Sequence, residues 1–541
     1  MKISTKSLSG VFLAGILVFV TVGTALANAI TGPSSSQSPY IVRSRSGVVT
    51  KAIFTVGDSA NFKPDGVTPY RMVGIPDGLG AFDNGDGTFT LLMNHELGNT
   101  IGTPRAHGNI GAFVSEWIIN KSDLSVVSVN DFIGDNTSIY LSNNNPATGT
   151  LHTSYLPGDT TIIARLCSAD LGASNAHLWT DPTTGITYGT DALIFESGEE
   201  SSGTQLTPQG QEARIDFGRQ FAFIATDDSN IPGNQANTAY ELPHQGLFGW
   251  ENNLVNPLSQ HKTIVVGNDD TSPAGQVYVW VGDKQTIGNV VERAGLTRQS
   301  PNDNLYVVKV NGLPPDASGA TNEDRATPLN GTFTLENEGD VSGLTAAQLE
   351  TLSDNKGGTQ FLRPEDGQWD SSNPSDYYFV TTDRYDQVKD GIGTQVGRSR
   401  LYRLHFTDIS QPELGGTIEA MLDGTEAGNM FDNMTINSRG QIVLQEDVGN
   451  QTHLGKIWQY SIATDILTLI AQHDQARFGN IGVPATAPFN QDEESSGIID
   501  VSSILGEGWY LLDVQAHYAT DAELAEGGQL LALHIPPGKF K

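Results

Sequence analysis

Short apolar runs that end in acidic or amide residues recur along the chain, and their pattern predicts β-strands. The runs are rich in β-branched and aromatic residues and are bounded by glycine or polar turns, which is typical of strands. Six of them cover residues 88–96, 192–200, 263–270, 377–383, 441–447 and 509–515. A second strand with alternating large apolar residues follows several of them, at residues 275–280, 400–404, 455–460 and 528–533. The chain is therefore predicted to be all-β.

A further segment precedes each of these six runs, and we expect it to form the innermost strand of the same unit. These segments are residues 74–80, 163–170, 243–246 with Glu251 beyond them, 361–370, 430–434 and 491–495. Six repeats of a short strand unit predict a single β-propeller of six blades around a central channel. A pair of β-sandwiches is the alternative, but it would not need the same polar strand ending in every unit.

The two ends of the chain predict how the ring closes. The last unit has strands near residues 498–501, 509–514 and 530–535, and little chain follows to supply an outer strand. Residues 51–57 have no partner in the first unit. Because a free strand edge exposes unpaired backbone groups, we expect residues 51–57 to pair with residues 530–535. The propeller domain then spans residues 51–541.

The N-terminus has the pattern of a secretory signal. Lys2 and Lys6 precede an apolar core at residues 11–22, and Ala25-Leu-Ala27 fits an A-x-A cleavage site. An uncleaved anchor is the alternative, although the run is short for a membrane span. We predict a signal peptide at residues 1–27 and a Ser/Pro-rich, flexible lead-in at residues 28–50. The mature protein is expected in the periplasm, outside the cell or on its surface, without membrane contact.

Charge and cysteine content narrow the range of partners. The net charge of -32 and the pI near 4.5 argue against nucleic acid and anionic membranes. The excess of carboxylates favours divalent cations, although a solvated acidic surface is the commoner meaning. The single cysteine, Cys167, cannot form an intrachain disulfide, so it is either buried and inert or a metal ligand. We expect a monomer.

Ligating side chains gather at the ends of the predicted strands. Each innermost segment brings an ionisable or metal-ligating side chain near one end. Carboxylates that converge on one channel mouth repel one another unless a cation is present. This predicts a metal site at the channel mouth; the alternative is that these side chains cap turns and face water. Candidate ligands from these segments and strand ends are Cys167, Asp366, Glu446, Asp447 and Glu493.

Residues 361–370 combine a guanidinium, three carboxylates and an indole. On an extended strand, Arg363 and Glu365 would point to the same side because they are two residues apart. A cation beside a carboxylate suits a site that holds a metal and an anionic group together. A surface ion pair on a strand edge is the alternative interpretation.

These motifs resemble the PhoX-type alkaline phosphatases, secreted bacterial β-propellers that use calcium and iron held mostly by carboxylates and one cysteine. The most specific motif in this resemblance is Arg363-Pro-Glu-Asp366. The resemblance implies that Arg363 binds phosphate and that Glu365 binds a metal. Asn94-His95-Glu96 looks like the Asn-His-Glu of that family, and Glu199-Glu200 resembles its glutamate pair, which adds Glu96, Glu199 and Glu200 to the implied ligands.

The chain departs from the family pattern at Gly198, where a cysteine precedes the glutamate pair in the family. Cys167, in a different segment, is the only thiol that could bind iron. The resemblance implies a metal-dependent hydrolase of small phosphate monoesters, with calcium as its cofactor and iron as a further candidate. A non-catalytic calcium-binding propeller and a lactonase-like ester hydrolase are the alternatives.

Overall fold

Most of the chain after the predicted signal peptide is described by the computed structural model. The described residues are 29–142, 155–157, 162–201, 204–206 and 214–540. The signal peptide predicted at residues 1–27 lies outside them. No helix within these described ranges is both long and apolar enough to cross a membrane.

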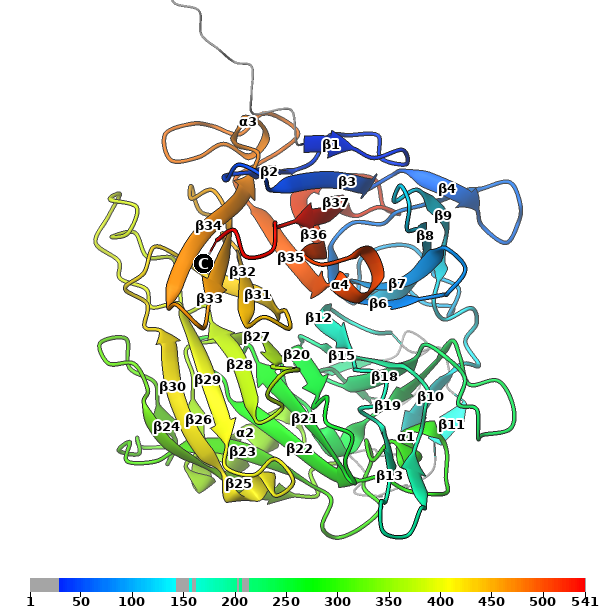
Figure 1. Ribbon diagram of the computed structural model, residues 1–541, viewed down its shortest axis with the longest axis vertical. Coiled ribbons are helices and arrows are strands. Elements are labelled where there is room, and N and C mark those ends of the chain that lie inside the picture. Colours follow the sequence, from blue (N-terminus) through cyan, green and yellow to red (C-terminus); the bar gives the residue numbers. More distant parts are fainter. Residues whose placement is uncertain (1–28, 143–154, 158–161, 202–203, 207–213, 541) are drawn as a thin grey trace, which may run out of the picture.

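Six strands lie nearest the centre of the molecule, and each forms the inner edge of a group of strands that runs outward (Figure 1). These innermost strands are β6 (Pro76–Asp83), β12 (Leu166–Leu171), β20 (Trp250–Val255), β27 (Pro364–Trp369), β31 (Phe431–Ile436) and β35 (Glu493–Asp500). Each one contacts the next along the chain, and β35 contacts β6, so they form a closed ring. The fold is therefore all-β and propeller-like.

The strand groups are numbered 1 to 6 in chain order, and each runs outward from its innermost strand. Group 1 continues from β6 to β7 (Thr88–His95), β8 (Phe113–Asn120) and β9 (Val126–Asp131). Group 2 continues from β12 to β15 (Ile194–Glu199), β18 (Gln220–Ile224), β19 (Thr238–Glu241), β10 (Ile139–Ser142) and β11 (Tyr155–Pro157). Group 3 continues from β20 to β21 (Lys262–Asp269), β22 (Val277–Asp283), β23 (Asn304–Val310) and β25 (Gly331–Gly339).

The remaining groups follow the same order. Group 4 continues from β27 to β28 (Asp376–Thr381), β29 (Arg400–Phe406) and β30 (Gly416–Leu422). Group 5 continues from β31 to β32 (Gln441–Glu446), β33 (Lys456–Ser461), β34 (Ile466–His473) and β2 (Ile41–Arg43). Group 6 continues from β35 to β36 (Trp509–Ala519), β37 (Glu526–His534), β3 (Val49–Thr55) and β1 (Ala29–Thr31). Pairing of β25 with β30 joins groups 3 and 4 into one nine-stranded sheet.

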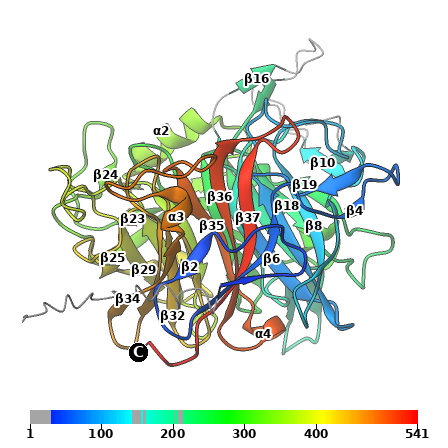
Figure 2. The ribbon, with the colours of Figure 1, turned by 90° about the horizontal axis from the view of Figure 1, so that it is seen from above.

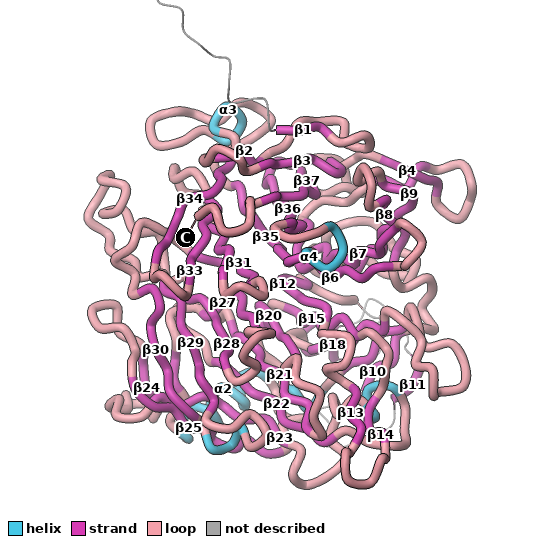
Figure 3. The backbone as a smooth tube through the Cα atoms, viewed as in Figure 1, coloured by secondary structure: helices cyan, strands magenta, loops and turns pink. Residues whose placement is uncertain are grey.

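Short ribbons and helices decorate the strand groups. The ribbons are β4 (Ser59–Phe62) with β5 (Pro69–Arg71), β13 (Leu178–Thr180) with β14 (Thr187–Gly189), β16 (Thr204–Leu206) with β17 (Arg214–Asp216), and β24 (Thr321–Asn322) with β26 (Thr359–Gln360). The helices are α1 (Val290–Arg293), α2 (Ala346–Lys356), α3 (Gln475–Phe478) and α4 (Ser502–Leu505), with 3-10 turns η2 (Pro243–Gln245) and η3 (Pro412–Leu414). Helices are few and short beside the strands (Figure 3). In the side view, β16 projects from one face and α4 lies at the opposite face (Figure 2).

Six hydrophobic clusters fill the spaces between neighbouring strand groups. One of them packs Phe89 and Trp117 of group 1 against Phe54 and Leu530 of group 6. Five others join groups 1 and 2, 2 and 3, 3 and 4, 4 and 5, and 5 and 6. Each sheet is thus apolar on both faces, because each face packs on a neighbouring group.

The ring closes through the pairing predicted between the two ends of the chain. Antiparallel pairing of β3 with β37 aligns Ala52 with Leu531 and Thr55 with Gln529. The preceding residues 28–50, predicted to be a flexible lead-in, contain β1 and β2 instead, described from residue 29 onward. β1 pairs with β3, and β2 pairs with β34 of group 5. This segment therefore belongs to the outer edges of two strand groups.

The predicted order of strands is found in the structure with one exception. The six runs with polar endings correspond to β7, β15, β21, β28, β32 and β36. The segment 243–246 was predicted to be the innermost strand of its unit, but Pro243–Gln245 forms the 3-10 turn η2. Proline lacks a backbone donor and favours such a turn. The innermost strand is β20, which begins seven residues after Pro243 and carries Glu251.

Candidate metal centre at the channel mouth

The same position in all six innermost strands carries a potential metal ligand. It is the second residue of each strand: Asp77, Cys167, Glu251, Glu365, Asp432 and Glu494. In five of the strands this position lies within a shift of the pairing register, between the first and the fourth residue, and in β35 the shift lies two residues later, between Ser495 and Ile498. Such bulges re-aim side chains and are common next to active sites. The repeated unit therefore brings one ligand from each strand group to the same end of the channel.

A turn with unusual backbone geometry precedes four of these strands. The residue just before the strand has a positive φ: Ile75 (50°), Arg165 (48°), Arg363 (60°) and Met430 (46°). A bulky residue in this region costs about 1–3 kcal/mol and persists only where the surrounding structure enforces it. The sequence predicted that Arg363 and Glu365 lie together on an extended strand. This prediction is wrong, because Arg363 adopts a positive φ just before the strand begins. Its guanidinium still reaches that carboxylate, with Nη2 3.2 Å from Glu365 Oε1.

Seven side chains form three overlapping groups in which the ligand atoms all lie within 4.8 Å of one another. The groups are Asp77 with Glu96 and Cys167, Cys167 with Glu200 and Glu251, and Glu251 with Glu365 and Asp432. We call these seven residues the mouth cluster. Because Cys167 and Glu251 are each shared by two groups, the cluster is one continuous row of candidate ligands.

The mouth cluster holds several buried acidic groups, and a bound positive charge would stabilise their ionised forms. Burial, reinforced by neighbouring carboxylates, raises the pKa of five carboxyls well above the ordinary range, namely Asp77, Glu200, Glu251, Glu365 and Asp432. Burial also raises the pKa of the Cys167 thiol, and the adjacent Asp77 raises it further. Asp77 Oδ1 and Glu251 Oε1 are buried and, among the described residues, have no hydrogen-bond partner. A cation bound between these groups would satisfy both the charge and the free oxygens.

Two arginines occupy equivalent places beside the mouth cluster. Arg363 forms a two-bond contact with Asp270, with Nε 2.8 Å from Oδ1 and Nη2 2.6 Å from Oδ2. Arg165 donates from Nε to Glu96 Oε1 at 2.7 Å and also binds Glu200. Each arginine directly precedes an innermost strand, and their side chains are 31% and 47% exposed. Each is thus anchored by carboxylates and keeps part of its guanidinium accessible.

Four residues predicted as ligands belong to the mouth cluster: Glu96, Cys167, Glu200 and Glu365. Cys167 joins it from a different strand than the family pattern implies, since Gly198 stands on β15 and Cys167 on β12. Five predicted ligands lie outside these groups: Glu199, Asp366, Glu446, Asp447 and Glu493.

Strand alternation explains why several predicted carboxylates lie elsewhere. Glu199 points away from its neighbour Glu200 and accepts bonds from Arg219 Nε at 2.9 Å and Nη2 at 2.7 Å. Glu446 likewise points away from Asp447 and accepts from His453 Nε2 at 2.7 Å and Trp458 Nε1 at 2.8 Å. Successive side chains of a strand face opposite sides, so one member of each acidic pair is used inside its strand group.

The other three predicted carboxylates also have their own surroundings. Asp366 accepts from Met434 N of the neighbouring strand β31 at 2.8 Å. Glu493 accepts from Gly455 N at 3.2 Å. Asp447 forms a backbone bridge with Glu494, and burial raises the pKa of its carboxyl to about 7.

Sequence reasoning named the segments that carry the remaining members of the mouth cluster but did not select Asp77, Glu251 and Asp432 themselves. The signal that could have found them is their equal place in the repeat, two residues after the turn that precedes each innermost strand. Glu251 lay beyond the predicted innermost strand, because that strand was placed at residues 243–246, where the structure has the turn η2. Asp270, which holds Arg363, follows β21 at the place where Glu96 follows β7 and Glu200 follows β15.

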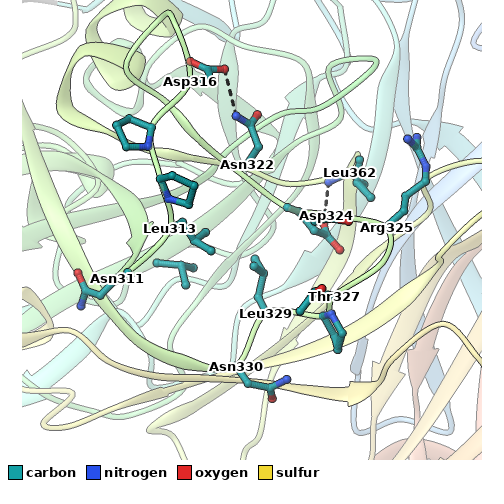
Figure 4. A pocket seen from close by; sticks show the side chains of 16 residues that line it. Asn311, Leu313, Asp316, Asn322, Asp324, Arg325, Thr327, Leu329, Asn330 and Leu362 are labelled. Atoms are coloured by element: carbon teal, nitrogen blue, oxygen red, sulfur yellow. Dashed lines mark hydrogen bonds between the residues drawn. The ribbon is translucent and has the colours of Figure 1, made fainter.

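A hollow of about 840 Å³ lies away from the mouth cluster, among the loops between β23 and β25 (Figure 4). Its wall includes Leu362, the residue before Arg363, and Glu323. Glu323 Oε2 accepts from Leu362 N at 2.8 Å, while its Oε1 accepts from Arg400 Nη1 at 2.6 Å and Tyr402 Oη at 2.8 Å. This buried network fixes the backbone that leads into Arg363.

The comparisons with known proteins bear on the fold. No protein-family model matches the chain, and no curated protein matches it. The chain is similar to the structure of Pseudomonas fluorescens PhoX in complex with vanadate, a transition state analogue, with a TM-score of 0.58 and 12% identity over 94% of this chain and 97% of that one.

Two other solved structures were matched at low TM-scores. A putative 6-phosphogluconolactonase from Bacteroides fragilis has a TM-score of 0.20 and 10% identity over 72% of this chain and 95% of that one. A puromycin-hydrolyzing peptidase from Mycobacterium tuberculosis has a TM-score of 0.25 and 8% identity over 82% of this chain and 58% of that one. Only the similarity to PhoX is therefore used among these three matches, and it shows a shared all-β, propeller-like fold.

Proposed function

We propose that this protein is an exported, metal-dependent phosphatase that hydrolyses small phosphate monoesters at the mouth cluster. The observation that carries the proposal is the position of Arg363 at one end of the cluster, between Asp270 and Glu365. A fixed guanidinium beside a row of buried metal ligands matches the charge and shape of a phosphoryl group. The PhoX-like fold supports the same reaction class.

The residues present fit metal ions of two kinds. Six of the seven cluster members offer carboxylate oxygens, which calcium prefers. Cys167 offers a sulfur ligand in two of the three groups, which suits a softer metal such as iron. When bound, such ions neutralise phosphate charge and lower the pKa of a bound water. We therefore propose calcium at the carboxylate groups and iron as the candidate partner of Cys167.

The protein's own part in catalysis is to position and stabilise the phosphate. Asp270 holds the Nε and Nη2 edge of Arg363, so the guanidinium cannot rotate freely. Nη1 has no hydrogen-bond partner among the residues that the structure describes, which leaves it able to donate to a phosphate oxygen. Donors that are fixed before the reaction stabilise the charge that develops in the transition state.

Further features of the proposal rest on the sequence and on strand topology. Six innermost strands and six intervening hydrophobic clusters support a propeller of six blades. The N-terminal pattern supports export, and the net charge of -32 supports a protein that does not bind nucleic acid or an anionic membrane. We propose that it acts as a monomer.

Elemental analysis combined with a phosphomonoester assay tests the proposal. The protein, purified from the exported fraction, should contain calcium and hydrolyse p-nitrophenyl phosphate. Chelator should remove both the metal and the activity, and calcium, with iron where the native protein contains it, should restore turnover. A metal-loaded protein that turns over no phosphomonoester would contradict the enzyme assignment and favour a non-catalytic calcium-binding propeller.

A further inference from the structure

Arg165 occupies in group 2 the place that Arg363 occupies in group 4. Each arginine directly precedes the innermost strand of its group, β12 or β27, and each has a positive φ, 48° and 60°. In both, the backbone carbonyl accepts a hydrogen bond from the first residue after the second strand of the group, from Glu200 N at 2.8 Å and from Thr382 N at 3.0 Å. The repeat therefore holds the two arginine backbones in the same way.

The two side chains also repeat one contact. Each guanidinium turns toward the preceding group and binds the first residue after the second strand of that group. This residue is Asp270 for Arg363 and Glu96 for Arg165. Both contacts use Nε and Nη2, and Nη2 of Arg165 also binds Glu200. Nη1 of Arg165, like that of Arg363, has no hydrogen-bond partner among the described residues, so each arginine keeps a free donor.

The two guanidiniums lie at different boundaries of the ring. Arg165 pairs with carboxylates of groups 1 and 2. Arg363 pairs with carboxylates of groups 3 and 4. The boundary between groups 2 and 3 therefore separates them, and their distance is on the order of 10 Å, the usual spacing of sheets that pack face to face. One phosphoryl group is too small to contact both, whereas a molecule with two anionic groups has the necessary length.

Exposure and charge favour an anion at Arg165. Its side chain is 47% exposed, more than the 31% of Arg363. Its two partners, Glu96 and Glu200, both belong to the mouth cluster. Carboxylates that bind a cation have less negative charge left to balance a guanidinium, so Arg165 keeps positive charge when the cluster holds metal. A guanidinium of this kind pairs with the oxygens of a phosphate or a carboxylate.

We propose that Arg165 binds a second anionic group of the substrate, so that the preferred substrates are phosphomonoesters with another phosphate or a carboxylate at the opposite end. This inference rests on the proposed function, because it takes the reacting phosphate to lie at Arg363. The second group takes no part in bond cleavage; Nη1 of Arg165 holds it and thereby orients the substrate. One charge-assisted hydrogen bond favours a substrate with two anionic groups by roughly tenfold to a hundredfold.

The first test measures binding, so that it does not depend on turnover. Calorimetry on the metal-loaded protein compares 1,6-hexanebisphosphonate with 6-hydroxyhexylphosphonate, whose carbon–phosphorus bonds a phosphatase does not hydrolyse. The wild type should bind the bisphosphonate roughly tenfold to a hundredfold more tightly, and Arg165→Ala should bring this ratio close to unity. Arg71→Ala is the matched control and should keep the ratio, since Arg71 is 33% exposed and pairs with Asp521 and Glu523, outside the mouth cluster. An unchanged ratio in Arg165→Ala would overturn the proposal.

Turnover separates this inference from the phosphatase assignment. The substrates are 1,6-hexanediol bisphosphate, 6-(phosphonooxy)hexanoate and 6-hydroxyhexyl phosphate, which carry a phosphate, a carboxylate or a hydroxyl at the far end. The wild type should show a higher kcat/KM with a phosphate or a carboxylate there, and the better of the two identifies the natural group. Equal kcat/KM for all three would contradict the second anion site and leave the phosphatase assignment in place. No turnover of any of them, with tighter binding of the bisphosphonate through Arg165, would contradict the phosphatase assignment alone.

A crystal structure of the metal-loaded wild type with 1,6-hexanebisphosphonate holds as a test even where Arg165→Ala loses metal or fails to fold. One phosphonate should lie within hydrogen-bond distance of Nη1 of Arg363 and the other within hydrogen-bond distance of Nη1 of Arg165. A bound bisphosphonate with neither end at Arg165 would overturn the proposal.

Discussion

Arg363 donates two parallel hydrogen bonds to Asp270, from Nε to Oδ1 at 2.8 Å and from Nη2 to Oδ2 at 2.6 Å. The two residues come from neighbouring strand groups, since Asp270 follows β21 and Arg363 precedes β27. A bidentate contact of this kind fixes both the position and the plane of the guanidinium. The contact therefore makes Arg363 a rigid donor at the edge of the mouth cluster.

Arg363→Ala should lower kcat/KM for a phosphomonoester by about a hundredfold or more, which is typical for removal of a transition-state donor. Metal content should stay at the wild-type level, because the cluster ligands are untouched. A suitable control is Arg439→Ala, since Arg439 lies on the surface and its one ion pair among the described residues is with exposed Glu507. If Arg363→Ala turned over substrate like the control, Arg363 would not bind the phosphate.

Asp270→Asn tests whether Asp270 positions Arg363. The substitution keeps the shape but weakens a charged contact worth about 1.5–3 kcal/mol, so a loss of roughly tenfold to a hundredfold in kcat/KM is expected. Because Asp270 acts through Arg363, the double variant with Arg363→Ala should be no slower than Arg363→Ala alone. Additive losses in the double variant would show that Asp270 has a separate role, such as direct metal binding.

Neighbouring glutamates on β15 should behave in opposite ways. Glu199 is fully buried against Arg219, so Glu199→Gln leaves an uncompensated charge and should destabilise the fold by about 3–5 kcal/mol. Glu200 belongs to the mouth cluster, so Glu200→Gln should lower metal content with a smaller effect on unfolding. Urea unfolding and elemental analysis of both variants decide the matter. Reduced metal content in Glu199→Gln alone would mean that the two roles are exchanged.

These two glutamates also show how far sequence reasoning reaches. The strand that ends at Glu199 and the acidic pair were predicted, as were the strand order and the pairing of β3 with β37. Which glutamate faces the channel depends on register at the strand end, and one residue of shift exchanges the two faces. The sequence carries no reliable mark for the positive φ of Arg363 or for the bulges, because neighbouring strand groups enforce them.

Removal of metal should make stability depend more strongly on pH, because the carboxyls of the mouth cluster then titrate together with other buried carboxyls such as Asp269 and Glu241. Burial raises the pKa of Asp269 to about 8 and that of Glu241 to about 7, and it raises the cluster carboxyls in the same direction. A carboxyl with a raised pKa binds its proton more tightly in the folded state, so its contribution to stability is greatest at low pH and is lost as pH rises toward the folded value. The Tm of chelated protein should therefore fall between pH 5 and pH 8.

Calcium should raise the Tm most at pH 8, because it binds only the folded cluster and replaces the protons lost there. Thermal scans at several pH values, with chelator and after addition of calcium, measure both effects. Magnesium at the same concentration is a useful control, since it demands octahedral geometry and dehydrates reluctantly. If the Tm at pH 8 changed neither with chelator nor with added calcium, this result would count against a metal site in this protein.

The N-terminal segment before β3 should contribute strongly to stability, contrary to its prediction as a flexible lead-in. Tyr40 is fully buried, and its ring makes edge contacts with Phe478 and Phe489 at centroid distances of 5.9 and 5.3 Å. Its backbone N donates to Gln529 Oε1 of β37 at 2.7 Å. Tyr40→Ala should therefore cost about 3–5 kcal/mol, as for other large aromatic truncations in a core.

Deletions of this segment test the same idea at larger scale. Removing residues 29–45 deletes β1, β2 and Tyr40, so it should destabilise the protein by at least as much as Tyr40→Ala. Removing residues 29–58 also deletes β3, which leaves the β37 edge unpaired and should prevent stable folding. Phe62→Ala, at a side chain that is 57% exposed, is the control and should change stability by less than about 0.5 kcal/mol. Urea unfolding midpoints measure these effects. If Tyr40→Ala and the shorter deletion both unfolded at the same urea concentration as Phe62→Ala, the segment would be dispensable for stability.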